Sequence, residues 1–373
     1  MEKVKLGEVC EILDNRRVPI TASERRKGIY PYYGANGIQD YVDSYIFDDE
    51  LVLLAEDGGN FGSKEKPIAY RVSGKCWVNN HAHVLKAKPN INIDYLCYAL
   101  MFYDVSSLVN GATRQKLTQA DMRKMEIPLP SLEEQKAIAE RLDKVSGLIE
   151  KRKTQLEKLD LLIKSRFIEM FGDSEHNTMN WPTVKLSTLC DVGSSKRIYQ
   201  SELTENGIPF LRISDLNERI DGEYNEPQLF IPNERFDELK TNGLVPSAGD
   251  ILVTARGTLG RCYIVKAEDK FYFQDGMISW LSDISENIRS LYISELFATT
   301  GVQKQIANLQ AGSTVAYLSI AMLKKLDIMI PPKALQQQFE TFVEQTDKSK
   351  FEIQKSLEKL EILKKSLMQQ YFG

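Results

Sequence analysis

The chain has 373 residues, a formal net charge of −4 and a hydrophobic content of 42%. These values predict a globular protein of two or three domains. The longest apolar runs, such as residues 51–55, are far too short to cross a bilayer, which argues against a membrane protein. Five cysteines without a C-x-x-C pair indicate reduced thiols, and we expect a cytoplasmic location.

The sequence contains an internal repeat of domain size. Residues 357–373 match residues 156–172 at an offset of 201, with 9 of 17 positions identical. Near the start of each copy, residues 4–10 and 184–190 share a Val-Lys-Leu triplet and a cysteine at an offset of 180. A period of this length indicates a tandem duplication of a domain and not a solenoid of short repeats.

Each copy consists of two parts. The first part mixes short β-like runs with helical patches and Gly, Asn, Asp and Pro, which predicts an α+β domain. Within it, the apolar run 51–55 aligns with 251–255, and a G-x-x-G follows each run. The second part begins after prolines and reads as a long helix. The predicted fold class is α+β: two repeated α/β-type domains, each followed by a long helix. The four parts are residues 1–130, 131–172, 173–330 and 331–373.

Heptad spacing of apolar residues runs through both predicted helices. We expect the helices to pair as an antiparallel coiled-coil spacer, because two similar amphipathic helices in one chain most simply cover each other. The alternative is that each helix folds back on its own domain. The predicted seam consists of Ile138, Leu142, Val145, Ile149, Leu156, Leu159, Ile163, Phe339, Val343, Ile353, Leu357, Leu360 and Leu367.

The usual catalytic motifs do not occur in the sequence. It has no G-x-x-x-x-G-K-[ST] phosphate loop and no G-x-S-x-G nucleophile turn. His81 and His83 offer two metal ligands from one strand, but no motif nearby completes the site. Asp250, Glu268 and Lys270 resemble the set that holds magnesium in some nucleases, yet the first copy has no counterpart. We therefore predict no catalytic residue, no metal and no cofactor in this chain.

Basic loops at corresponding places in the two copies favour recognition of DNA. Arg and Lys side chains hold phosphates or read guanine, and Asn and Gln pair with adenine. For any single residue, a solvated surface charge is the competing interpretation. The candidate DNA contacts are Arg16, Arg17, Lys64, Asn80, His81, Arg114, Lys116, Lys196, Arg197, Tyr199, Arg212, Arg256, Arg261, Gln274 and Tyr317.

These features together resemble the specificity (S) subunit of type I restriction-modification enzymes over essentially the whole chain. The resemblance rests on the openings at 4–10 and 181–186, the Gly-Asp-Ile-Leu stretch that begins at Gly249, the helix entry 127–135 and the helix exit 170–173. Each motif alone is weak, but their order, given twice at the right length, is specific. The second helix entry lacks the acidic pair of the first, which hints that the two helices dock their partners differently.

The resemblance implies a non-catalytic subunit with two target-recognition domains, each reading one half of a bipartite double-stranded DNA target. The helices would set the gap and dock two methyltransferase (M) subunits, and restriction (R) subunits would join the assembly. S-adenosylmethionine, ATP and magnesium are then expected in the partner subunits. Two other interpretations remain open at this point, a protein-binding structural adaptor and a magnesium-dependent nuclease.

Overall fold

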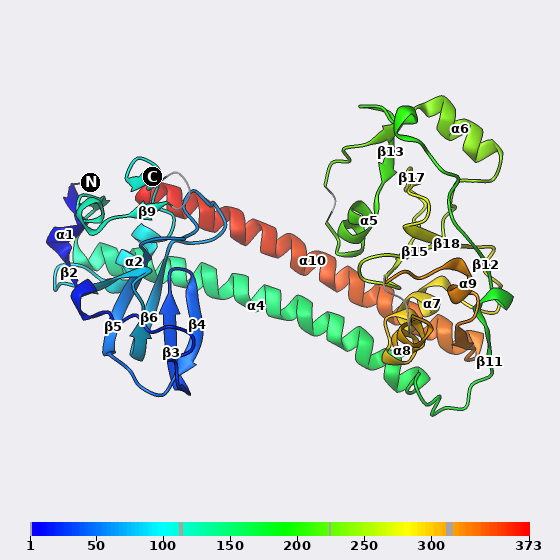
Figure 1. Ribbon diagram of the computed structural model, residues 1–373, viewed down its shortest axis with the longest axis horizontal. Helices are drawn as coiled ribbons and strands as arrows, with labels where there is room; N and C mark the ends of the chain where they lie inside the picture. The colour runs from blue at the N-terminus through cyan, green and yellow to red at the C-terminus, as the bar shows by residue number, and fades with distance from the viewer. Residues whose placement is uncertain (1, 112–114, 224, 311–315) are drawn as a thin grey trace. The chain divides into compact units, whose positions relative to one another are not determined.

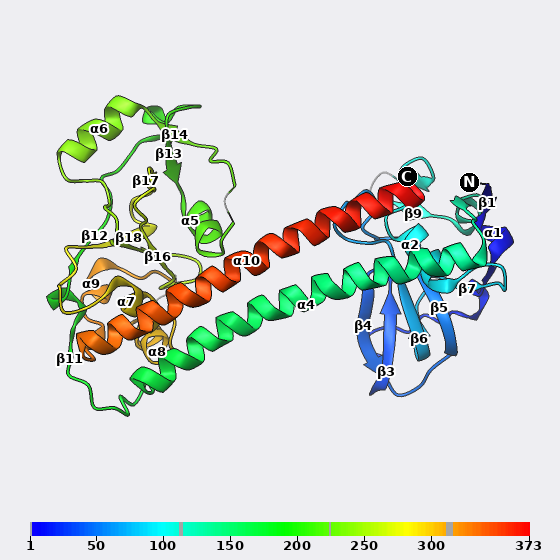
Figure 2. The same ribbon diagram turned by 180° about the vertical axis from the view of Figure 1, so that it is seen from behind.

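The computed structural model describes residues 2–111, 115–223, 225–310 and 316–373. The chain forms two compact units, both shown in Figure 1 and from behind in Figure 2. Unit 1 comprises Met1–Thr154 and Gln354–Gly373, and unit 2 comprises Gln155–Ile353. Both ends of the chain therefore belong to unit 1. The division differs from the predicted linear order of parts, because each long helix contributes one portion to each unit.

Unit 1 is built on a six-stranded sheet in the order β2-β7-β5-β6-β3-β4, antiparallel except where β3 runs parallel to β6. In that order the strands are β2 (Cys10–Ile12), β7 (Ala82–Ala87), β5 (Phe47–Ala55), β6 (Ala69–Val78), β3 (Lys27–Gly34) and β4 (Gly37–Val42). The other elements are β1 (Lys3–Lys5), α1 (Leu6–Val9), η1 (Asp14–Arg16), α2 (Ile93–Met101), β8 (Val109–Asn110), β9 (Lys116–Leu117), α3 (Gln119–Met122) and β10 (Glu126–Pro128).

The central strand β5 is buried on both faces, which explains its continuous apolar sequence. Val52 and Leu54 belong to the core that includes helix α2 and the start of the long helix α4 (Leu132–Phe171). Leu51 and Leu53 belong to a second core on the opposite side of the sheet. Successive side chains of a strand point to opposite faces, so one run of apolar residues supplies both cores.

Unit 2 repeats the first four strands of this order, β2-β7-β5-β6, as the sheet β12-β18-β15-β16. A separate three-stranded sheet, β14-β13-β17, again contains one parallel pair, β13 with β17. The elements are β11 (Thr183–Lys185), η2 (Leu186–Thr188), β12 (Asp191–Gly193), η3 (Gln200–Glu202), β13 (Ile208–Leu211), α5 (Ile213–Ile220), β14 (Phe230–Ile231), α6 (Asn233–Thr241), β15 (Ile251–Thr254), β16 (Cys262–Ile264), β17 (Tyr272–Phe273), β18 (Ile278–Ser282), α7 (Ser290–Phe297), α8 (Thr300–Leu309), α9 (Ile320–Leu323) and β19 (Asp327–Met329).

Strand pairing fixes which residues of the two units correspond. In unit 1, Val52 pairs with Leu85 of β7, and in unit 2, Ile251 pairs with Leu281 of β18. Leu85 pairs in turn with Ile12 of β2, and Leu281 pairs with Val192 of β12, the strand at the same edge of its sheet. Val52 therefore corresponds to Ile251, one residue away from the alignment predicted from sequence, which matched Leu51 with Ile251. A run of apolar residues has no polar alternation to fix its register, so the sequence alone did not resolve this step.

The two long helices, α4 and α10 (Lys333–Phe372), run antiparallel within each unit, as predicted. In unit 1, Arg141 of α4 donates a hydrogen bond to the Tyr371 hydroxyl at 3.1 Å. In unit 2, Lys350 of α10 forms an ion pair with Asp160 of α4 at 2.7 Å. In each unit an earlier part of one helix thus meets a later part of the other. None of the described helices is long and apolar enough to span a membrane.

The predicted helix seam is buried mainly where the helices also contact the sheets. Phe167 and Phe171, which the heptad pattern omitted, are buried in unit 2 and pack around Phe339. They contact the domain core as well as the second helix, which a two-helix pattern does not anticipate. The buried seam residues are Ile138, Leu142, Val145, Ile149, Ile163, Phe339, Val343 and Leu357. The partly exposed ones are Leu156, Leu159, Ile353, Leu360 and Leu367.

Candidate nucleic-acid interface

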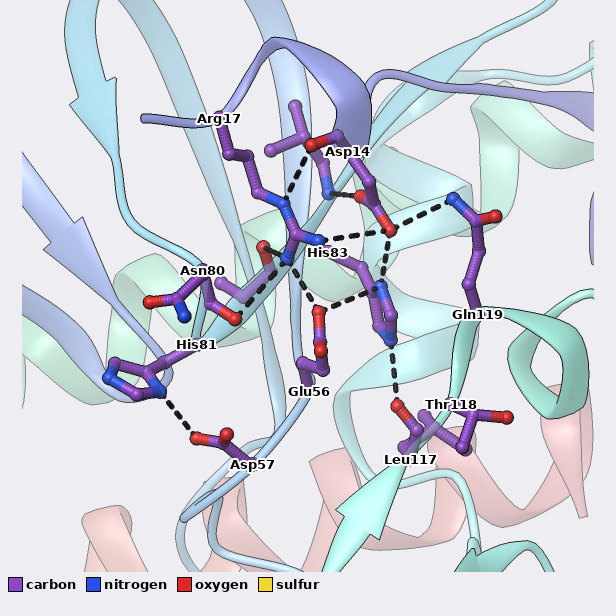
Figure 3. A network of polar contacts seen from close by, with 12 residues as sticks. Asp14, Arg17, Glu56, Asp57, Asn80, His81, His83, Leu117, Thr118 and Gln119 are labelled. Atoms are coloured by element: carbon purple, nitrogen blue, oxygen red, sulfur yellow. Dashed lines mark hydrogen bonds and ion pairs between the residues drawn. The ribbon is translucent and has the colours of Figure 1, made fainter. Parts of the chain in front are cut away.

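In unit 1, four segments that are distant in sequence meet at one end of the sheet (Figure 3). They are the η1 turn, the end of β5, the loop into β7, and β9 with the following turn. Glu56, immediately after β5, lies between Arg17 and His83. Several of the predicted DNA contacts belong to these segments, so their geometry bears directly on the candidate interface.

The Arg17 side chain is largely buried, with 13% of its surface exposed. Its Nη1 atom lies 2.6 Å from the Glu56 carboxylate, and its Nη2 atom lies 3.6 Å from that of Asp14. The same guanidinium donates to the carbonyl of Ala82 at 2.8 Å and to that of Asn80 at 3.5 Å. The donors of Arg17 are thus used within the protein, and its contact with DNA stays a prediction.

His83 is fully buried beside this pair. Its Nε2 atom lies 2.9 Å from the Leu117 carbonyl oxygen, and its Nδ1 atom lies 2.7 Å from the Asp14 carboxylate, both at hydrogen-bond distance. The imidazole ring is thus held between two oxygen atoms, one from the backbone and one from a carboxylate. Burial alone would raise the pKa of Asp14, but the hydrogen bond and charge of His83, with Val84 N–H and Arg17, hold it below its usual range.

Lys116 completes the network from the solvent side. Its Nζ atom lies 2.9 Å from Glu56 Oε1, and its side chain remains half exposed. Burial alone would raise the pKa of Glu56, but the hydrogen bonds from Lys116 and Arg17 keep that pKa below its usual range. The same hydrogen bond raises the pKa of Lys116. Both buried carboxylates are therefore compensated by cations of the chain.

The structure supplies the carboxylates that the histidine pair lacked in the sequence. The ligand atoms of Asp14, Glu56 and His83 lie within 4.8 Å of one another, and His81 contacts Asp57 at 2.6 Å. A divalent cation at the first group would meet the guanidinium of Arg17, which already occupies both carboxylates. The arrangement is that of a compensated ion network, and we assign no metal to it.

A cavity of about 520 Å³ opens beside the network in unit 1. Its wall carries the amide side chains of Asn36, Gln39, Asn79 and Asn80, together with His81. Asn79 Nδ2 donates to Gln39 Oε1 at 3.1 Å, whereas Asn80 is exposed and its side chain has no hydrogen-bond partner among the described residues. Exposed amides beside a concave surface are suited to reading base edges.

The corresponding end of unit 2 is held by hydroxyl groups. Ser194 Oγ donates to the Ile278 carbonyl at 3.0 Å, and Ser195 Oγ donates to the Phe273 carbonyl at 2.7 Å. Lys196 is exposed, and Arg197, 66% exposed, donates to Asp275 at 2.8 Å. The hydrogen bond to Asp275 raises the pKa of Arg197. The basic pair of the second copy thus lies at the surface, unlike Arg17.

Two further arginines of unit 2 differ in their availability. Arg256 is exposed, with its guanidinium 5.2 Å from the ring centre of Tyr317. Arg261 instead contacts Asn217 at 2.9 Å and forms an ion pair with Asp221. The guanidinium of Arg256 is therefore available at the surface, whereas that of Arg261, just before β16, is held by residues of helix α5 and its C-terminal end. The DNA contacts of both residues stay predictions.

The other candidates differ in how far they are exposed. Arg16 is exposed, with a long ion pair to Asp49 at 3.9 Å, and Arg212 is half exposed beside Asp215. Gln274 is half-buried, and its backbone N–H donates to the Leu211 carbonyl. Lys64 and Tyr199 are exposed at the surface. Arg114 lies outside the described residues.

The nuclease interpretation loses its central residue. Asp250 accepts hydrogen bonds from Trp280 Nε1 at 2.9 Å and from Ser247 N–H at 2.8 Å. Burial raises the pKa of Asp250 above its usual value. This carboxylate therefore supports the turn before β15, which is a structural role.

Comparison with known proteins decides the family. The profile of the family described as "Type I restriction modification DNA specificity domain" matches residues 1–159 and 179–364. The chain belongs to this family. A putative type I restriction enzyme specificity subunit of Haemophilus influenzae is 33% identical over 335 residues, covering 88% of this chain and 82% of the relative. The MjaVIII specificity subunit of Methanocaldococcus jannaschii is 25% identical over 395 residues, covering 96% and 90%.

The fold agrees with that membership. A crystal structure of the type I restriction-modification S subunit from M. genitalium superposes with a TM-score of 0.61 at 16% identity, covering 100% of this chain and 96% of that one. The specificity-subunit family and its repeated domains, predicted from sequence, are confirmed. The adaptor and nuclease interpretations are not favoured by these relatives.

Proposed function

We propose that this specificity subunit is non-catalytic and that each unit reads one block of a bipartite DNA target. The observation that carries the proposal is the repetition of one sheet order, β2-β7-β5-β6 and β12-β18-β15-β16, with exposed polar loops at the same end of each sheet. A duplicated recognition domain within one chain of this family suits a target made of two short sequences. Phosphate contacts would set the register, and base-edge contacts would set the sequence.

We assign the docking of two methyltransferase subunits to the long helices. Exposed apolar residues at matching places support this assignment, because Leu161 and Leu162 in unit 2 correspond to Ile362 and Leu363 in unit 1. Such residues are candidates for burial in a protein interface. Two like surfaces favour two like partners. The partners would supply S-adenosylmethionine chemistry on adenine, and restriction subunits with ATP and magnesium would complete the assembly in the cytoplasm.

The test is a map of methylated adenines by single-molecule sequencing. Cells would express this chain with the methyltransferase from its own genome, and the control cells would lack this chain. We expect a new methylated motif of two short blocks separated by a fixed gap. Exchange of residues 1–130 for those of a relative should change one block and leave the other. Stable co-purification of the two proteins without any new motif would favour the adaptor interpretation.

A further inference from the structure

Arg17 is hydrogen-bonded to the segment that carries two candidate base contacts, Asn80 and His81. Its guanidinium donates to the carbonyls of Asn80 and Ala82, the residues on either side of His81. The position of the Asn80–His81 backbone at the edge of the cavity thus depends on where this guanidinium is held. Figure 3 shows Arg17 approaching the segment from the side of the η1 turn.

The guanidinium is itself held by buried charges. Glu56 fixes one of its nitrogens at 2.6 Å, and Asp14, oriented by His83 at 2.7 Å, lies beside another. The Val84 N–H also donates to Asp14, at 2.9 Å. Charge-assisted hydrogen bonds in a buried place are strong and directional. A change in one carboxylate therefore changes the position of the Arg17 guanidinium and of the backbone to which it donates.

The described residues of unit 2 do not form a network of this kind. The correspondence of Val52 with Ile251 extends along the strands, and the Glu56 and Ala255 carbonyls accept the N–H groups of Leu117 and Leu318 in the same way. By this correspondence, Ser194, Ala255 and Ser279 of unit 2 take the places of Asp14, Glu56 and His83. The hydrogen bond from Arg17 to the Ala82 carbonyl is replaced as well. In unit 2 the corresponding carbonyl is that of Ile278, and it accepts from Ser194 Oγ and not from a guanidinium.

We propose that Arg17, Glu56, Asp14 and His83 are positioning residues that fix the Asn80–His81 segment against its block of the DNA target. The block read by unit 2 would not use a buried network of this kind, since Arg197 pairs with Asp275 at the surface there. This inference rests on the function proposed above and specifies how one of the two blocks is read. It assigns sequence fidelity to side chains that do not touch DNA.

The decisive variant is Glu56→Gln, because it keeps the shape of the side chain and removes the charge that anchors Arg17. We call the block read by unit 1 the first block and the block read by unit 2 the second block. A mismatched base pair ordinarily costs about 1–3 kcal/mol of binding free energy, and loss of part of this penalty should raise methylation of sites with one mismatch in the first block by roughly tenfold. The second block should stay unchanged. Arg17→Lys should have the same effect, because lysine keeps the charge but loses the planar fork.

A direct contact of Arg17 with phosphate gives a different pattern. In that case Arg17→Ala would weaken binding to all sequences alike and reduce the salt dependence, while the motif would stay intact. Glu56→Gln would then leave the sequence specificity of methylation unchanged at both blocks, and this result overturns the proposal. The matched control is Glu50→Gln, an exposed carboxylate of unit 1 that is paired with Arg71 and lies outside the network. It should preserve both blocks.

A second variant and a second measurement guard against loss of folding. The double variant Arg17→Met, Glu56→Met replaces the ion pair with apolar side chains, a change that buried pairs often tolerate. It should co-purify with the methyltransferase and still allow methylation of sites with a mismatch in the first block. Methylation restricted to sites with an exact first block would overturn the proposal. Hydrogen exchange of the purified chain adds a readout that needs no methylation. Amides of residues 80–82 should exchange faster in Glu56→Gln than in Glu50→Gln.

The two proposals fail separately. If the wild-type complex gives no two-block motif, the proposed function fails, and the exchange comparison still decides whether the network positions the segment. Unchanged exchange at residues 80–82 in Glu56→Gln overturns the positioning role. A sharp wild-type motif, relaxed in one block by Glu56→Gln but not by Glu50→Gln, supports both proposals.

Discussion

Gln135 and Gln336 make the same three hydrogen bonds at the start of the two long helices. In unit 1, the Gln135 side-chain oxygen accepts from the Asn92 N–H at 2.7 Å. Its nitrogen donates to the carbonyls of Pro130 at 2.9 Å and Asn90 at 3.3 Å. One amide side chain thus joins α4 to the loop before α2 and to the proline-containing segment that precedes the helix.

The counterpart in unit 2 repeats each contact. Gln336 accepts from the Arg289 N–H at 2.9 Å and donates to the carbonyls of Pro331 at 2.8 Å and Asn287 at 3.1 Å. Both glutamines are at most 1% exposed. The two helix entries differ in sequence around this residue, so the shared glutamine is the part of the entry that the junction between domain and helix requires.

We expect Gln135→Leu to lower the free energy of unfolding by about 2 kcal/mol or more, because it leaves buried backbone groups without partners. The melting temperature should fall by roughly 4–8 °C. Gln336→Leu should behave alike. Calorimetry on the purified chain measures the effect, with the exposed Gln338→Leu as the matched control. Equal stability of Gln135→Leu and Gln338→Leu would contradict the assigned role.

The sequence predicted the duplicated domains and the antiparallel helices because both are written as repeated patterns along the chain. It did not predict the role of Gln135, although the residue belongs to the helix-entry motif that carried the family resemblance. Its partners Asn90 and Asn92 lie 45 and 43 residues earlier. A polar residue at a helix entry gives no sign in the sequence of which distant backbone groups it will contact.

The candidate DNA contacts show the same limit. Residue type and loop context selected Arg17, Arg197, Arg256 and Arg261 alike, and only the fold separates those whose donors are used internally. The carboxylate that binds the Arg17 guanidinium is that of Glu56, which is 39 residues away in the sequence. A carboxylate directly after a buried strand was the one signal available, and it did not by itself identify a partner.

The aromatic cluster of unit 2 gives a second prediction. Phe171 is fully buried, with its ring centre 4.8 Å from that of Tyr292 and 5.5 Å from that of Phe339. Phe171→Ala should lower the free energy of unfolding by about 3–5 kcal/mol through lost burial and a residual cavity. Ile168→Ala, on the exposed side of the same helix turn, should change it by less than about 0.5 kcal/mol. Denaturant unfolding of the two variants makes the comparison, and similar losses would contradict the packing.

Arg256 gives a third prediction, which concerns binding. Its exposed guanidinium over Tyr317 is placed for a phosphate contact, so Arg256→Ala should weaken binding of the assembled complex to all DNA sequences alike. The slope of log affinity against log salt should become shallower by about 0.9. Fluorescence anisotropy over a salt series measures both quantities. Lys304→Ala, whose lysine pairs with Glu175, serves as a control that should leave the slope unchanged. A relaxed motif with an unchanged slope would instead indicate base reading by Arg256.

His176 gives a fourth prediction, which depends on pH. Its Nδ1 atom lies 2.5 Å from the Asp173 carboxylate, and the hydrogen bond and charge of Asp173 raise the pKa of His176 above its ordinary value of 6.5. A raised pKa in the folded chain means that the contact stabilises the fold fully below pH 6.5, and that this contribution is lost as pH rises through the folded pKa. The ring is solvent-exposed, so the effect on overall stability should be small.

Titration by NMR tests this directly, because the chain has only three histidines and His176→Asn identifies the signal. We expect Asp173→Asn to move the pKa of His176 back toward 6.5. Glu175→Gln should produce a smaller shift in the same direction, since Glu175 acts on His176 only through its charge. High salt should weaken the influence of Glu175 more than that of the hydrogen-bonded Asp173. A wild-type pKa at or below 6.5, unaffected by Asp173→Asn, would show that the Asp173–His176 contact does not persist in solution.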